Sequence, residues 1–339
     1  MNKDWHIFVA GSDLYGPGEL DEYFADLSVT VGVGSETDPT SRWEEAAGAT
    51  HLVIARATIT EEVLDQLPRL RAIVKFGRGL ERIDVEAATG HGVLVVYTPQ
   101  AVQGMAEAAL LLMLALSKNL FAHVRAAQQG KHLGNPGNQD EQAQFHHLPL
   151  GSELGGKTLG VVGFGSIGST LASMAQGIGM RILIHTRTPD PAAAADCQGE
   201  FTSLDELLAR SDYVSLNLTP LPDGRPLLDE SRLAQMKDGA VLINTARGSL
   251  VDEEALIAAL RSGKLAGAGL DVVADEPLQL DNPLLNMEKV IVTPHSLGVT
   301  EESMRKIKEG TRRALELLLA GRLPPHVANP DVVEREESL

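Results

Sequence analysis

The sequence predicts an α/β fold that contains two doubly wound parallel sheets. Short β-branched runs alternate with helical segments through most of the 339 residues, which is typical of parallel strands covered by helices on both faces. A segment rich in Gly, Asn, Gln and Pro, residues 130–156, divides this alternation into two series. A glycine turn follows the first strand of the second series, and such a turn joins strand to helix in many parallel sheets.

The first series contains five expected strands with helical segments between them. The segment TEEVLDQL is expected to be helical, and Thr58 and Glu61 have the spacing of a capping box ahead of its apolar residues. A long amphipathic-to-apolar helix is expected over Gln103–Asn119. The five strands are His6–Ala10, Val29–Val33, His51–Arg56, Ala72–Lys75 and Val93–Tyr97.

The second series contains six expected strands, the number in a full dinucleotide-binding sheet. Residues 130–156, which precede it, are expected to form an extended loop or arm. A last helix, Glu301–Leu319, follows the sheet and can return to the first domain, and the acidic tail, residues 331–339, is expected to fray. The six strands are Thr158–Val162, Arg181–His185, Asp212–Asn217, Ala240–Asn244, Gly267–Val272 and Lys289–Val292.

The composition excludes several classes of partner. Lys and Arg total 29 against 46 Asp and Glu, a formal charge of −17, whereas nucleic acids and anionic membranes are bound by basic surfaces. The single cysteine, Cys197, cannot form an internal disulfide, which favours a reducing compartment. The start lacks the apolar region of a signal peptide, and the longest apolar run, Ala108–Leu116, is too short to span a bilayer. We therefore expect a soluble cytoplasmic protein with no nucleic-acid or membrane partner.

Three glycines, Gly163, Gly165 and Gly168, fit the pattern G-x-G-x-x-G between an expected strand and an expected helix. The first permits the tight turn, the second lets the backbone approach a pyrophosphate, and the third allows the helix to pack closely on the strand. This placement predicts dinucleotide binding. The alternatives are a purely structural turn or another ligand, because glycine turns are common between strands and helices.

Three polar side chains follow expected strands of the second series. Arg247, Glu276 and His295 each come shortly after a strand, where ligands bind in open α/β sheets. Arg can bind a carboxylate bidentately, and His can give or take a proton near neutral pH. A nearby Glu would favour the imidazolium form of that His. Together the three suit a substrate with a carboxylate and a carbonyl, although each alone could be a turn residue or a surface ion-pair partner.

The segments INTARGSLVDEEAL, LDVVADEPL and TPHSLGVT resemble the signature regions of the D-isomer-specific 2-hydroxyacid dehydrogenases. The likeness extends over most of the chain, from Leu70 onward. It implies that Arg247 binds and polarises the substrate, that His295 is the proton donor and that Glu276 is its partner. It also implies a set of cofactor contacts, namely Ser166, Ile167, Thr245, Ala246 and, near the nicotinamide carboxamide, Asp271.

The same resemblance implies a domain organisation. A Rossmann nucleotide domain, residues 102–296, is expected as an insertion in a flavodoxin-like substrate-binding domain formed by residues 1–101 and 297–330. Members of the family are typically homodimers, and the helix and arm at about residues 103–150 are the expected dimerisation region. No metal ion is expected.

The expected substrate loop departs from the family's pattern. It reads FGRGLERID, which keeps Gly77 and Gly79 but places Arg78 between them, where a small residue is usual. The N–H group of Gly79 is still expected to hold the substrate carboxylate. Lys75 and Arg78 would bind a second anionic group of the substrate, unless both side chains point to solvent.

The end of the second strand of the nucleotide domain decides the cofactor. NAD-binding sheets usually carry an Asp or Glu there, which accepts hydrogen bonds from the adenine ribose. This chain has Thr186, Arg187 and Thr188 instead, and a guanidinium can bind the 2′-phosphate of NADP through charge-assisted hydrogen bonds. We therefore expect NADP(H) to be preferred, with NAD(H) as the alternative if Arg187 projects into solvent. A further departure from the family's pattern, at Thr219-Pro220-Leu221, leaves a cofactor contact near Thr219 open.

These observations favour an NAD(P)-dependent oxidoreductase that interconverts a small 2-oxo acid and a D-2-hydroxy acid, working as a reductase. The cofactor would carry the hydride and His295 the proton. The alternative is a dinucleotide-sensing binding protein, similar to corepressors that resemble this family, in which the state of the cofactor controls partner binding. Formate or phosphite oxidation would need different substrate contacts.

Overall fold

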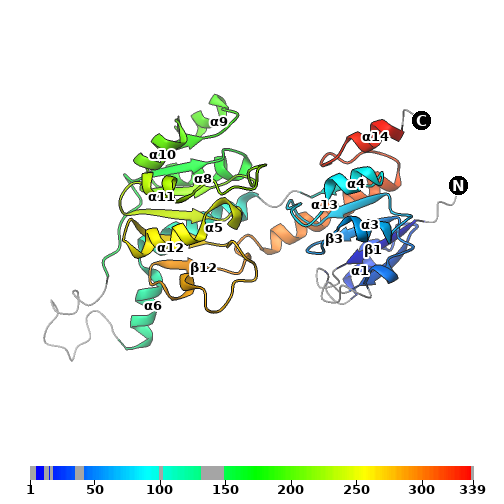
Figure 1. Cartoon of the computed structure of the whole chain (residues 1–339), viewed down its shortest axis with the longest axis horizontal. Coiled ribbons are helices and arrows are strands. Elements are labelled where there is room, and N and C mark those ends of the chain that lie inside the picture. The colour runs from blue at the N-terminus through cyan, green and yellow to red at the C-terminus, as the bar shows by residue number, and fades with distance from the viewer. Residues whose placement is uncertain are drawn as a thin grey trace. The chain divides into compact units, whose positions relative to one another are not determined.

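The chain forms two compact units (Figure 1). The computed structural model describes residues 5–10, 15, 18–34, 42–98, 102–130 and 149–336, with the side chains of all of these except Arg42 and residues 334–336. Unit 1 comprises Met1–Ala101 and Glu301–Leu339, and unit 2 comprises Val102–Thr300. The second boundary was expected at residue 297, but in the structure it lies after Thr300. Residues 298–300 stay with unit 2 because Gly298 and Thr300 pack against Gly104. Most of the expected arm, residues 131–148, falls outside the described residues.

The sheet of unit 1 has five parallel strands in the order β2-β1-β3-β4-β5. Helices α2, α3 and α4 pack on one face, and α1, α13 and α14 pack on the other. The strands are β1 His6–Ala10, β2 Thr30–Gly34, β3 His51–Ile54, β4 Ala72–Lys75 and β5 Leu94–Tyr97. The helices are α1 Glu19–Phe24, α2 Arg42–Glu45, α3 Glu61–Asp65, α4 Val85–Gly90, α13 Glu301–Leu319 and α14 Asp331–Glu336.

The expected capping box of α3 is wrong. The helix begins after Thr60, whose backbone is extended with φ −103° and ψ 173°. Thr58 lies two residues before that position, and the residue after it, Ile59, is held in a parallel β-bridge to Ile83. Thr60 rather than Thr58 therefore precedes the helix, because the bridge holds the residue between them against a segment distant in sequence.

The acidic tail, which was expected to fray over residues 331–339, begins with a helix that packs on unit 1. The side chain of Asn329 accepts a hydrogen bond from the N–H group of Val95 at 2.7 Å and donates one to the carbonyl of Val93 at 2.9 Å. Helix α14 follows, and its Val332 is buried in the core. The first residues of the expected tail are therefore helical because an apolar side chain anchors them.

The sheet of unit 2 has seven parallel strands in the order β12-β11-β10-β9-β6-β7-β8. The strands are β6 Thr158–Val162, β7 Arg181–His185, β8 Glu200–Phe201, β9 Tyr213–Leu216, β10 Ala240–Asn244, β11 Leu265–Leu270 and β12 Val290–Val292. Six of these strands are predicted by the sequence, whereas β8 is not, because a strand of two residues has no periodic pattern.

Helices cover both faces of this second sheet (Figure 1). One face carries α5 Val102–Ser117, α8 Ser166–Gly177 and α9 Pro191–Asp196, and the other carries α10 Leu204–Arg210, α11 Glu230–Gln235 and α12 Glu253–Arg261. Two short 3₁₀ helices, η2 Gly248–Leu250 and η3 Pro283–Asn286, follow strands β10 and β11. The unit is thus doubly wound.

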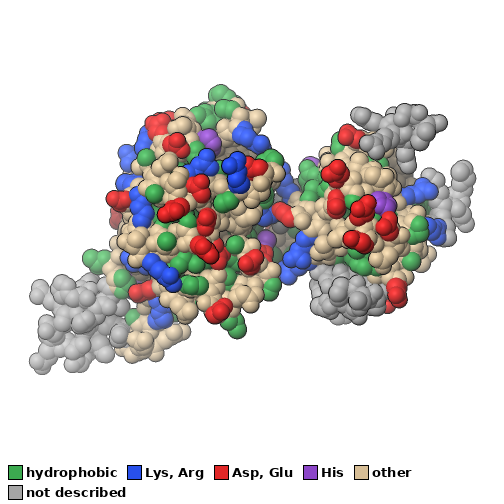
Figure 2. Space-filling view, viewed as in Figure 1, with side chains coloured by type: hydrophobic (Ala, Val, Ile, Leu, Met, Phe, Trp, Pro, Cys, Tyr) green, Lys and Arg blue, Asp and Glu red, His purple; other side chains and the backbone are tan. Residues whose placement is uncertain are grey.

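The long apolar helix ends earlier than expected. Helix α5 stops at Ser117, and Asn119 adopts a left-handed backbone, with φ 49°, before α6 Leu120–Gln128 begins. Among the described residues, no single helix has the length and hydropathy to cross a bilayer, and α5 and α6 satisfy such a test only as a pair bent by 61°. Figure 2 shows acidic and basic side chains interspersed over the visible surface of each unit.

Candidate active site

The glycine turn joins β6 to α8 and leaves open space in front of the helix. Gly163 has a left-handed φ of 91°, its N–H group donates to the carbonyl of His185 at 2.8 Å, and an added Cβ would lie 2.5 Å from the carbonyl oxygen of Asn217. At Gly168 an added Cβ would lie 2.2 Å from the carbonyl oxygen of Gly163, so the helix packs tightly on the turn. At Gly165, the residue that precedes α8, an added Cβ would meet nothing within 4 Å.

The turn therefore has the shape of an anion site. The N–H groups in the first turn of a helix lack intrahelical partners, and the helix dipole favours negative charge there. Ser166 and Ile167 occupy these first positions of α8. Beside the turn, the buried Oδ1 atom of Asn217 has no hydrogen-bond partner among the described residues.

The end of β7 carries no carboxylate in the position that an NAD-binding sheet would use. Thr186 is half-buried, whereas Arg187 and Thr188 are exposed. The first acid after the strand, Asp190, caps α9 instead, because its Oδ1 accepts hydrogen bonds from the N–H groups of Ala192 and Ala193 at 3.0 and 3.2 Å.

Three strand ends lie side by side at the carboxyl edge of the sheet. Asn244 on β10 pairs with Leu270 on β11, which pairs with Val292 on β12. The segments that carry Arg247 and His295, and the segment of Glu276 between them, leave the sheet from these ends. The register thus delivers all three side chains from adjacent strands.

The segment of Arg247 is shaped by buried Asn244. The Asn244 Nδ2 donates to the carbonyl of Arg247 at 2.8 Å, and its Oδ1 accepts from the N–H group of Ala246 at 3.1 Å. Thr245 between them is buried. At Gly248 an added Cβ would lie 1.7 Å from the carbonyl oxygen of Val273, so the backbone after Arg247 passes directly against the backbone that leads to Glu276.

The loop of His295 is held by buried Asp271. The Asp271 Oδ1 accepts hydrogen bonds from Thr293 Oγ1 at 2.6 Å and from the N–H group of Ser296 at 3.0 Å. The N–H group of Leu297 lies 3.3 Å from both carboxylate oxygens. Between these anchors His295 has a φ of 55°, a left-handed backbone that non-glycine residues rarely adopt outside turns and functional sites.

His295 and Glu276 form a hydrogen-bonded pair. The Nδ1 atom of His295 lies 2.9 Å from Oε2 of Glu276, and the two side chains are 44% and 36% exposed. A carboxylate bound at one ring nitrogen orients the imidazole and fixes the proton on that nitrogen. The second ring nitrogen, Nε2, is then directed away from the carboxylate.

The predicted substrate loop belongs to unit 1 and follows β4. The alternative that both basic side chains point to solvent is wrong for Lys75, which is 9% exposed and donates through Nζ to the carbonyl of Phe76 at 2.9 Å. Arg78 is exposed and Gly79 is half-buried. Gly77 has φ 98°, and its N–H group donates to Thr98 Oγ1 at 2.8 Å.

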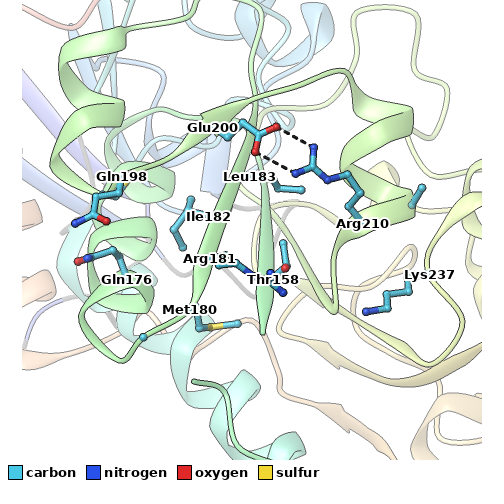
Figure 3. A pocket seen from close by; sticks show the side chains of 13 residues that line it. Thr158, Gln176, Met180, Arg181, Ile182, Leu183, Gln198, Glu200, Arg210 and Lys237 are labelled. Carbon is cyan, nitrogen blue, oxygen red and sulfur yellow. Dashed lines mark hydrogen bonds and ion pairs between the residues drawn. The ribbon is translucent and has the colours of Figure 1, made fainter. Parts of the chain in front are cut away.

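A pocket of about 690 Å³ lies at the opposite edge of the unit 2 sheet, beside the first residues of β6 and β7 (Figure 3). Three of its four charged side chains, those of Glu200, Arg210 and Lys237, are engaged in ion pairs. Arg210 forms a fork with Glu200 at 2.8 and 3.0 Å, and Lys237 contacts Asp212 at 2.7 Å. Arg247 and the His295–Glu276 pair follow the carboxyl ends of the strands, so this pocket is not the candidate active site.

The remaining predicted features of the site are Thr219 and the absence of a metal ion. Thr219, the residue whose cofactor contact the sequence leaves open, is exposed after β9. Within the described ranges, no group of three or more His, Cys, Asp or Glu side chains could hold a metal ion. The role of Asn244 was not predicted, although the residue lies in the motif INTARGSLVDEEAL; the signal was an amide side chain at the end of an apolar strand.

The chain is similar to known proteins over most of its length. Residues 110–296 match the family model of the NAD binding domain of the D-isomer specific 2-hydroxyacid dehydrogenases. The chain is 38% identical to a D-3-phosphoglycerate dehydrogenase of Mycobacterium leprae over 281 residues, which are 83% of this chain and 51% of that protein. It is 36% identical to a glyoxylate reductase of Thermococcus litoralis over 280 residues, which are 81% of this chain and 82% of that protein.

A solved structure shows the same likeness over nearly the whole chain. It is a glyoxylate reductase from Paecilomyes thermophila, with 30% identity and a TM-score of 0.83 over 97% of this chain and 99% of that chain. The chain therefore spans about half the length of the mycobacterial relative and most of the length of the two glyoxylate reductases.

Proposed function

The chain belongs to the D-isomer specific 2-hydroxyacid dehydrogenase family, and we propose that it reduces a small 2-oxo acid to the D-2-hydroxy acid. The His295–Glu276 pair, with its 2.9 Å hydrogen bond, carries this proposal. Arg247 leaves a strand whose end is in register with the strands that precede the pair. A proton donor beside a carboxylate-binding guanidinium is what the reduction of a 2-oxo acid requires.

The residues divide the chemistry among them. Arg247 binds the substrate carboxylate and polarises the adjacent carbonyl. His295 gives a proton from Nε2 to the carbonyl oxygen, which becomes the hydroxyl group. Glu276 orients the imidazole through Nδ1 and fixes the proton on that nitrogen. The nicotinamide, when bound, supplies the hydride for the carbonyl carbon.

The residues at the glycine turn fit a dinucleotide. The open space before Gly165 and the first turn of α8 suit a pyrophosphate. In this proposal Gly163, Gly168, Ser166 and Ile167 complete that contact. The other cofactor residues are Thr245, Ala246, Asp271 and Thr219.

We infer a preference for NADP(H) over NAD(H). Three features support it: Arg187 is exposed, no described residue pairs with its guanidinium, and Asp190 is engaged as a helix cap. Thr186 and Thr188 add hydroxyl groups beside it. A guanidinium and two hydroxyls can bind the 2′-phosphate, and no strand-end acid repels it.

The substrate loop supports a substrate with a second anionic group. In this proposal the N–H group of Gly79 binds the carboxylate, and the exposed guanidinium of Arg78 binds the second anion. Lys75 would contribute its positive charge, with Nζ already bound to the carbonyl of Phe76, and Gly77 would shape the turn.

We also propose a homodimer formed through α5, α6 and the arm. Five large apolar side chains on these two helices are at least 39% exposed, namely Leu111, Leu114, Leu120, Phe121 and Val124. Exposed apolar side chains at this density mark protein contact surfaces. Light scattering should give twice the monomer mass, and a Leu111→Glu, Phe121→Glu variant should be monomeric.

A cytoplasmic location suits the single buried cysteine.

The test is a reduction assay with glyoxylate, hydroxypyruvate, pyruvate, phenylpyruvate and phosphohydroxypyruvate, using NADPH and NADH in parallel. We expect turnover of at least one acid, with kcat lowered and KM raised in Arg247→Ala. A protein that binds NADPH but reduces none of these acids would instead favour the dinucleotide sensor. Wild-type kinetics in Arg247→Ala would overturn the role assigned to the guanidinium.

A further inference from the structure

Both carboxylate oxygens of Glu253 accept hydrogen bonds from a segment that is distant in sequence. Glu253 is the first residue of α12. Its Oε2 accepts a hydrogen bond from the N–H group of Ala274 at 3.1 Å, across 21 residues. Its Oε1 accepts one from Nδ2 of Asn282 at 2.7 Å, across 29 residues. Asn282 in turn caps η3, because its Oδ1 accepts from the N–H group of Leu284 at 2.9 Å.

These two contacts enclose Glu276. Ala274 precedes it and Asn282 follows it, so one carboxylate fastens the segment on both sides of the partner of His295. The Glu276 side chain is itself 36% exposed and is bound to His295. Its position therefore depends on how its backbone is held rather than on burial.

A helix-capping role does not account for Glu253. The cap of α12 is Asp252, whose Oδ1 accepts a hydrogen bond from the N–H group of Ala255 at 3.1 Å. An acid in the first helical turn interacts favourably with the helix dipole wherever its side chain points. Its two directed contacts with the Glu276 segment are a separate feature.

We propose that Glu253 is a positioning residue that sets the distance between Glu276 and His295. This inference rests on the proposed function, because it assumes that the His295–Glu276 pair serves proton transfer. Glu253 lies a few residues after Arg247 on the same connection. It thereby ties the geometry of the proton-donating pair to the segment that binds the substrate carboxylate.

The test compares Glu253→Gln with Glu254→Gln. A glutamine offers one acceptor and one donor, so its Nε2 must face either the Ala274 N–H group or the Asn282 amide, both of which are donors. We expect kcat to fall about tenfold to a hundredfold, as a small displacement at a reacting centre does, with an unchanged dissociation constant for NADPH. Glu254 is the neighbouring acid, exposed and on the same helical turn, so Glu254→Gln should keep wild-type kcat.

A double-mutant cycle separates positioning from general destabilisation. If Glu253 acts through Glu276, the Glu253→Gln, Glu276→Gln variant should be no slower than Glu276→Gln alone. Multiplied losses would overturn the inference while leaving the proposed function in place. Wild-type kcat in Glu276→Gln would instead overturn the role of the pair in the proposed function, and the inference with it.

A second measurement does not depend on turnover. Amide hydrogen exchange in residues 274–282 should accelerate in Glu253→Gln, while α12 keeps its protection. Unchanged exchange in that segment would contradict the inference. If Glu253→Gln does not fold, Asn282→Ala removes one of the two contacts and is expected to show the same pattern with a smaller loss of kcat.

Discussion

Lowering the pH from 7 to 5 is expected to destabilise unit 1 through His51. This residue is buried at the start of β3, with Nδ1 3.0 Å from Thr50 Oγ1 and its ring packed edge-on against Trp5 at 5.1 Å. Burial, with a smaller effect from the positive charge of Arg71, lowers the pKa of His51 from 6.5 to about 4. The folded unit therefore holds the neutral ring.

The sign follows from proton linkage. The unfolded chain binds a proton at His51 below its ordinary pKa of 6.5, whereas the folded unit binds it only near pH 4. The stability that the neutral ring provides is present above pH 6.5 and is lost as the pH falls toward 4. Between pH 7 and pH 5 this linkage lowers the free energy of unfolding by about 2 kcal/mol.

The chain offers a direct assay of this effect. Both of its tryptophans, Trp5 and Trp43, lie in unit 1, so their fluorescence during urea unfolding reports on that unit. A His51→Gln variant can still hydrogen-bond to Thr50 but cannot titrate. The difference in unfolding free energy between wild type and this variant therefore removes the contribution of every other titrating group. The reasoning is refuted if the wild type loses no more stability than this variant between pH 7 and pH 5.

Four further predictions concern unit 2 and the substrate loop. His295→Ala should lower kcat about a hundredfold or more with nearly unchanged NADPH affinity, because proton transfer and cofactor binding use different groups; near-wild-type turnover would contradict the assignment. NADPH should be preferred about tenfold or more in kcat/KM, since one charge-assisted contact contributes roughly 1.5–3 kcal/mol, and a Thr186→Asp, Arg187→Leu variant should lose this preference. A wild type that prefers NADH would rule that reading out. Arg78→Ala should penalise a phosphorylated or dicarboxylic 2-oxo acid more than glyoxylate, whereas equal changes in kcat/KM would leave its charge without a role in specificity. Gly168→Ala should lower both the melting temperature and the affinity for NADPH, because its Cβ would lie 2.2 Å from the carbonyl oxygen of Gly163; an unaltered protein would contradict that packing.

Features encoded by local sequence were predictable. The bounds of β1, β4, β6, β7, β10 and α13 agree with the expected ranges, because each of these elements is a single apolar or amphipathic run with clear ends. The roles of Gly163 and Gly168 also follow from their spacing, since a left-handed turn and a close helix contact are local requirements.

Features that depend on distant partners were not predictable. The bridge from Ile59 to Ile83 separates Thr58, the expected capping residue, from the start of α3, and the burial of Val332 gave helical structure to part of the acidic tail. Strand β8 is two residues long and exists through its pairing with β7. In each case the deciding contact joins residues whose separation leaves no periodic signal.

The same distinction changes how Asp271 is to be understood. Its expected role near the nicotinamide follows from its place in a family motif. In the structure, however, its carboxylate accepts hydrogen bonds from Thr293 Oγ1 and from the N–H groups of Ser296 and Leu297. These three donors flank His295, so replacing Asp271 would release the loop that holds the proton donor. A loss of turnover in an Asp271 variant would therefore combine two effects. Only a change in the dissociation constant of the cofactor, measured separately from kcat, would report a nicotinamide contact.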